Sequence, residues 1–163
     1  MVGSFQVKAQ DNTVKFNLFS IIVRTGSFFY ERKINDNSSA QLGFFYTGAT
    51  VSDVKFRGFG ITPEYRYYPS GNAMNGFYVA PYLRYQNLKI EQTADDKATL
   101  SSFGGGLLVG RQWIFNEKIA LDIFAGPNYN AGNVKVTSGS VDEVAGGFDG
   151  FGVRLGLALG IGF

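Results

Sequence analysis

Eight charged side chains alternate with apolar residues along the chain, and together they could pair with one another or conduct ions. Charges that share a narrow, poorly hydrated space must be paired or hydrated, because an isolated buried charge is costly. Rings of charge that line a pore can also select the ions that pass through it. The eight residues are Lys15, Glu31, Lys33, Glu64, Arg66, Arg84, Asp122 and Arg154.

Two interpretations of this charged set stay open. The favoured one is a network of salt bridges that fills the interior of the protein and has a structural role. The alternative is a narrow channel of low conductance for ions or small solutes. Such a channel would favour anions, because Lys and Arg outnumber the acids in the set.

The composition argues against catalysis. The chain has no Cys and no His, which excludes disulfides, zinc sites of the usual kind and a His general base. Glu64 and Asp122 could form a carboxylate pair, but they fall on strands far apart in chain order. We therefore expect no catalytic, cofactor-binding or metal-binding residue. The net charge of +2 is too small to indicate nucleic acid as a partner.

The elements that carry these residues are strands. The closing segment FGVRLGLALGIGF, residues 151–163, alternates bulky apolar residues with Gly, Ala and Arg, and this is the period of a strand. Pro63, Pro81 and Pro127 fall inside predicted strands, although proline cannot donate to a strand ladder. Alternation predicts eight strands, over residues 13–23, 27–34, 39–50, 55–69, 76–91, 98–115, 119–136 and 151–163.

The strands predict an all-β fold, an eight-stranded antiparallel up-and-down transmembrane β-barrel. No run of about 18 apolar residues could form a transmembrane helix, whereas most strands reach the roughly 9–11 residues that a tilted spanning strand needs. Short turns on one side and polar extracellular loops on the other would place both termini in the periplasm. We expect a lead-in or signal-peptide remnant at 1–12 and one barrel domain at 13–163.

The apolar face of the strands is assigned to lipid. The opposite face is mainly Gly and Ala, which suits the narrow lumen of an eight-stranded barrel. From Phe77 to Tyr85 is roughly 27 Å along a strand, or about 20 Å along a tilted barrel axis, close to the height of a membrane belt. A soluble lipocalin-like carrier, with its apolar face inside, is the second alternative. The expected membrane-interface aromatics are Tyr67, Phe77, Trp113 and Phe163.

Three stretches and the Phe-terminated last strand resemble a known family. They are FGITPEYRYYPSG at 59–71, GFYVAPYLRYQ at 76–86 and NLFSIIVRTGSFFYERKI at 17–34. These are similar to uncharacterised small outer-membrane barrels of Gram-negative bacteria, with a domain of unknown function and a build like that of OmpA, OmpX and OmpW. The resemblance implies insertion by the outer-membrane assembly machinery, but no activity. The implied assembly signal is Leu155, Leu157, Leu159, Ile161 and Phe163.

The sequence therefore predicts a monomeric, non-enzymatic outer-membrane protein of the cell envelope with a structural or surface-interaction role. Its expected partners are the lipid bilayer of the outer membrane and the assembly machinery. Any recognition of envelope proteins is expected at the loops 93–97 and 137–147.

Overall fold

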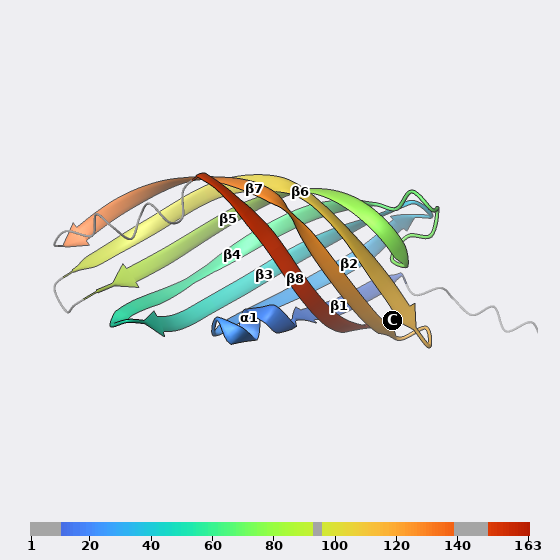
Figure 1. The fold of residues 1–163 in the computed structure, drawn as a ribbon, viewed down its shortest axis with the longest axis horizontal. Helices are drawn as coiled ribbons and strands as arrows, with labels where there is room; N and C mark the ends of the chain where they lie inside the picture. The colour runs from blue at the N-terminus through green and yellow to red at the C-terminus, as the bar shows by residue number, and fades with distance from the viewer. Residues whose placement is uncertain (1–10, 93–95, 139–149) are drawn as a thin grey trace, which may run out of the picture.

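Eight antiparallel strands form a closed barrel in chain order, and β1 pairs with β8 to complete it (Figure 1). The computed structural model describes residues 11–92, 96–138 and 150–163. None of these residues belongs to a helix that is long and apolar enough to cross a membrane. The strands are β1 (Asn12–Asn17), β2 (Thr25–Asn35), β3 (Ser38–Val51), β4 (Val54–Tyr67), β5 (Gly76–Glu91), β6 (Lys97–Phe115), β7 (Ile119–Ser138) and β8 (Gly150–Gly162).

The predicted barrel is confirmed, but the predicted first strand at 13–23 is wrong beyond Asn17. Strand β1 ends there, and a short helix, α1 (Leu18–Ile22), follows it. The Asn17 side chain accepts a hydrogen bond from the Phe19 N–H at 3.1 Å, which caps the helix. The segment LFSII also lacks the alternation of a strand. Arg24, with φ of 52°, then turns the chain back into β2.

The alternation along each strand separates an apolar outer wall from an interior that holds the buried charged side chains. Leu155 is 57% exposed on the outside, whereas Arg66 is 0% exposed inside. Exposed large apolar residues occur on all eight strands. This arrangement is the reverse of the apolar interior that a soluble lipocalin-like carrier requires.

The three prolines inside strands are accommodated by interruptions of the ladder. Pro63 and Pro81 lie where the pairing of β4 with β5 is interrupted. Between the pairs Ile61–Tyr85 and Tyr67–Val79, only Glu64 and Tyr82 are paired. Pro127 lies in a similar interruption between β6 and β7. The register is the same on both sides of each interruption, so each proline costs ladder contacts and needs no inserted residue.

The two ends of the barrel differ. The turns at 36–37, 68–75 and 116–118 share one end with the C-terminus (Figure 1), and there the Asn12 N–H donates to the Phe163 carbonyl at 3.1 Å. Strands β5, β6 and β7, of 16, 19 and 20 residues, extend toward the other end.

The predicted loops and the predicted lead-in fall largely outside the described residues. The loop predicted at 93–97 is described only at Asp96 and Lys97, and Lys97 begins β6. Of the loop predicted at 137–147, residues 137 and 138 belong to β7. Of the lead-in predicted at 1–12, only residues 11 and 12 are described, and Asn12 begins β1.

Closure of the barrel requires a bare interior at the β1–β8 seam. A Cβ added at Gly160 would lie 2.6 Å from the Lys15 Cγ and would collide with the Val14 carbonyl oxygen. We predict that Gly160→Val destabilises the barrel by about 1–3 kcal/mol. The measurement is the temperature at which the folded, fast-migrating band disappears in a heat-modifiable gel shift. Leu159→Val, on the exposed side of the same strand, is the matched control, and equal temperatures for both variants would contradict the prediction.

Candidate functional site

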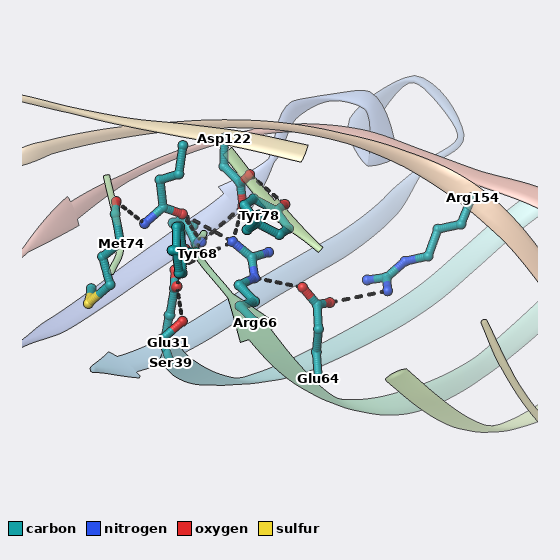
Figure 2. Close-up of polar contacts among 11 residues, drawn as sticks. Glu31, Ser39, Glu64, Arg66, Tyr68, Met74, Tyr78, Asp122 and Arg154 are labelled. Atoms are coloured by element: carbon teal, nitrogen blue, oxygen red, sulfur yellow. Dashed lines mark hydrogen bonds and ion pairs between the residues drawn. The ribbon is translucent and has the colours of Figure 1, made fainter. Parts of the chain in front are cut away.

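Six of the eight predicted lumen charges meet in one network inside the barrel (Figure 2). At its centre, Lys15 Nζ lies 2.6 Å from Glu31 Oε2 and 3.0 Å from Asp122 Oδ2. Lys15 also donates to Gln112 Oε1 at 2.5 Å. All four residues are buried, so this contact ties β1, β2, β6 and β7 together across the lumen.

Arg66 extends the network toward the middle of the barrel. Its Nε donates to Glu64 Oε1 at 2.6 Å, and its Nη1 donates to Asp122 Oδ2 at 2.7 Å. Its guanidinium carbon lies 4.2 Å from the centre of the Tyr78 ring. Figure 2 shows Arg154 reaching from β8 toward Glu64, where its Nη1 lies 3.4 Å from Oε2. Glu64 and Asp122, which belong to strands far apart in chain order, are thus joined through the Arg66 guanidinium.

Hydroxyl groups donate hydrogen bonds to the carboxylate oxygens that Lys15 and Arg66 do not contact most closely. Glu31 Oε1 accepts from the Tyr68 hydroxyl at 2.8 Å and from the Ser39 hydroxyl at 2.5 Å. Asp122 Oδ1 accepts from the Tyr78 hydroxyl at 2.8 Å. A buried ion pair is stable only when its remaining hydrogen-bonding capacity is met, and these hydroxyls meet much of it.

The turn at 68–75 closes the end of the barrel beneath the network. Tyr68, Ala73 and Met74 are buried, and the Met74 carbonyl accepts from Gln112 Nε2 at 2.9 Å. The turn therefore folds against the lumen rather than away from it. Tyr68 and Ser39 are parts of the site that sequence reasoning did not identify. The alternation does indicate them, because each lies an even number of positions from the inward-facing residues of its strand.

Two predicted members lie outside the network. Lys33 pairs instead with Asp36 at 3.3 Å, at the end of the barrel, where the Asp36 side chain is 86% exposed. Arg84 has no carboxylate within 4.0 Å among the described residues. It donates to Thr62 Oγ1 at 3.3 Å and lies 5.3 Å from the Phe45 ring centre. The prediction that both join the charge network is wrong, because strand parity places a side chain inside without fixing its partner.

Two register predictions at this site are confirmed. Glu64 pairs with Tyr82 across β4 and β5, and Gln112 pairs with Asp122 across β6 and β7. Among the described residues, no three His, Cys, Asp or Glu side chains gather where they could hold a metal ion.

The lumen toward the other end is apolar. Leu88, Ile90, Ala98 and Leu100 are buried against each other, and partly buried Phe45, Val54 and Phe56 pack on them. The lumen thus has a charged layer near the short turns and an apolar layer near the longer strands, with Arg84 between them.

The outer wall carries the other predicted residues. Tyr67, Phe77 and Phe163 are exposed, Trp113 is partly buried, and the Arg111 guanidinium lies 4.6 Å and 5.0 Å from the Phe77 and Trp113 ring centres. On β8, the side chains of Leu155, Leu159 and Ile161 are exposed and Leu157 is partly exposed, and Phe163, directly after the strand, is also exposed. Their positions fit the predicted interface and assembly roles, which stay predictions.

Comparisons with known proteins identify a family and a fold. A family model described as "Protein of unknown function (DUF3575)" matches residues 1–136. No curated protein sequence matches the chain. The barrel is similar to the crystal structure of a major outer membrane protein from Thermus thermophilus, with a TM-score of 0.57 and 14% identity over 93% of this chain and 99% of that chain. That likeness shows the fold alone.

A second solved structure is also similar. It is the N-terminal β-barrel domain of Pseudomonas aeruginosa OprF, with a TM-score of 0.49 and 14% identity over 94% of this chain and 98% of that chain.

Loss of one network carboxylate should be far more costly than loss of an exposed one. We predict that Asp122→Ala destabilises the barrel by about 3–5 kcal/mol, because Lys15 and Arg66 would keep their buried charges without this shared partner. Asp36→Ala, which removes an exposed ion pair with Lys33, should cost less than about 1 kcal/mol. Urea unfolding in detergent, followed by tryptophan fluorescence, measures both. Similar midpoints for the two variants would contradict this account of the network.

Proposed function

The chain belongs to the DUF3575 family of proteins of unknown function, and on that premise we propose that it is an outer-membrane β-barrel with a plugged lumen and a structural or surface-interaction role. The observation that carries the proposal is the distribution of side chains, which is the reverse of that in a water-soluble protein. The apolar side chains are exposed over the outer wall, and the charges are buried inside. Water would not stabilise such an outer wall, whereas the hydrocarbon of a bilayer would.

A closed barrel also solves the backbone problem of a membrane. Every backbone N–H and C=O in the hydrocarbon must find a partner within the protein. The pairing of Thr13–Asn17 with Ala158–Gly162 leaves no open sheet edge along that part of β1 and β8. The solved barrel with the same fold is described as an outer membrane protein. By the same proposal, the end with the short turns and the termini faces the periplasm.

The state of the lumen favours a structural role over transport. Three bases, Lys15, Arg66 and Arg154, are paired with three acids, Glu31, Glu64 and Asp122. A permeating ion would have to break these pairs and pass the turn at 68–75. The same mutual engagement leaves no carboxylate of the network poised for catalysis, so the proposal includes no enzymatic activity.

The proposed partners follow from the outer wall and the two ends. The lipid bilayer covers the apolar wall, and the assembly machinery recognises the last strand through Leu155, Leu157, Leu159, Ile161 and Phe163. Envelope proteins would bind at the end of the barrel that carries the segments 93–97 and 137–147. A monomer suffices for each of these roles.

Planar-bilayer recording tests whether the lumen is plugged. We predict that the purified wild-type barrel gives no steady conductance, because the paired charges and the turn at 68–75 block the path. Arg66→Ser, which removes the largest fully buried side chain, should raise the conductance above the wild-type level. Arg57→Ser, at an exposed position of the same strand, is the matched control and should leave it unchanged.

A steady wild-type current would contradict the plugged lumen and favour the narrow channel. In that case Glu64→Ala or Arg84→Ala should change the current, since both side chains lie along the lumen. Fractionation of cells into outer and inner membranes separately tests the location, and recovery of the folded protein in the soluble fraction would overturn it.

A further inference from the structure

The barrel wall is interrupted between β1 and β8. Strand β1 ends at Asn17, opposite Ala158, but β8 extends on to Gly150. Pairing of β1 with β2 likewise ends at Phe16 and Phe28. In place of a strand, α1 lies beside this part of β8 (Figure 1). The half of β8 from Leu157 back to Gly150 therefore has a strand neighbour on one side only, among the described residues.

Two cavities meet at this interruption. One, of about 260 Å³, lies in the lumen and is lined by Phe29, Thr62, Arg84 and Arg154, among others. The second, of about 250 Å³, lies under α1 and is lined by Phe19, Val23 and Leu155, among others. The residues that line both are Asn17, Ser27, Phe45, Arg84 and Leu155. The two cavities thus join the lumen to the side of the barrel, and Arg84 stands at their junction.

The junction carries an excess of positive charge. The lumen network balances Lys15, Arg66 and Arg154 against three carboxylates, so the half-buried Arg84 adds one charge that no described carboxylate within 4.0 Å offsets. Arg154 has only the distant 3.4 Å contact with Glu64, whose other oxygen binds Arg66 at 2.6 Å. A guanidinium that is partly removed from water and has no counter-charge is unfavourable, so this site favours an anion.

The route to this site is from the side. The charged network and the turn at 68–75 close the lumen at one end, and toward the other the buried cluster of Leu88, Ile90, Ala98 and Leu100 makes the described lumen apolar, which disfavours entry of an anion. The side route passes Phe19, Val23 and Leu155 on an outer wall that the proposed location places in lipid. An anion that arrives by this route must carry an apolar part.

We propose that Arg84 and Arg154 bind the carboxylate or phosphate head of a single-chain anionic amphiphile, whose acyl chain leaves the barrel between α1 and β8. This inference goes beyond the structural role and rests on the proposed membrane location only for the source of the ligand. The lumen cavity of about 260 Å³ has the volume of about nine waters at roughly 30 Å³ each. It therefore holds the head and the first carbons, and the rest of the chain occupies the cavity under α1.

Dodecanoate is the probe that tests the site, by calorimetric titration of the wild-type barrel in micelles of an uncharged detergent. We expect saturable binding that Arg84→Gln weakens about tenfold or more, since a charge-assisted hydrogen bond is lost. Arg84→Lys should retain part of the affinity. Lys89→Gln, which removes an exposed cation from the same strand, is the matched control and should bind as the wild type does. Folding of each variant is verified by its heat-modifiable gel shift.

Competition experiments distinguish an anionic amphiphile from a small water-soluble anion as the ligand. Acetate and inorganic phosphate should displace dodecanoate only at far higher concentration than octanoate does. Displacement by phosphate at the same concentration would overturn the amphiphile and leave a site for small anions. Absence of dodecanoate binding, or equal binding by wild type and Arg84→Gln, would overturn the site itself.

A second measurement keeps the inference testable if Arg84→Gln does not fold. Wild-type barrel is irradiated with dodecanoate that carries a diazirine at its far end, and the labelled peptides are identified. Label is expected within 17–27 or 150–158, the segments that border the side opening. Label confined to other parts of the outer wall would contradict the proposed path. Because both binding measurements are made in detergent, their failure is separable from failure of the outer-membrane location, which fractionation tests.

Discussion

Lys15 and Arg66 share the carboxylate of Asp122, at 3.0 Å and 2.7 Å, and this contact joins β1, β4 and β7 across the lumen. The narrow interior of an eight-stranded barrel leaves little room for water, so each charge inside must be met by protein groups. Glu31, Glu64 and the hydroxyls of Tyr68 and Tyr78 meet that requirement. The bare Gly and Ala positions around them exist because these long side chains fill the space.

The short helix α1 is the place where the barrel departs from a uniform wall. Its five residues take the position of a strand between β2 and the far half of β8, and the wall there is formed by side chains rather than by a ladder. Phe151, 89% exposed, lies on that half of β8. Arg84, which has no described carboxylate within 4.0 Å, lies inside the same region, so the part of the wall without a β1–β8 ladder lies beside this unpaired charge.

Much of this structure is predictable from the sequence, because period-2 alternation determines which face each residue occupies. It gives the strand count and the charged lumen, and the position of the turn between the two strands gives the register of Glu64 with Tyr82. Alternation fails at LFSII, residues 18–22, since apolar residues stand there on consecutive positions. It also fails to identify partners. Alternation places Arg84 inside. It does not give the position of each residue along the barrel axis, and this position determines that Arg66, and not Arg84, reaches Asp122.

In a membrane barrel the apolar side chains face lipid and the charged and small ones face the lumen, and the absence of native Cys makes this arrangement directly measurable. Spin labels at Val79→Cys and Leu159→Cys probe the outer wall, and labels at Ala80→Cys and Ala158→Cys probe the buried face of the same strands. In lipid vesicles, the accessibility of each label to oxygen, which concentrates in the hydrocarbon, should be high for the first pair and low for the second. Equal accessibility for both pairs, or the reverse order, would contradict the membrane barrel.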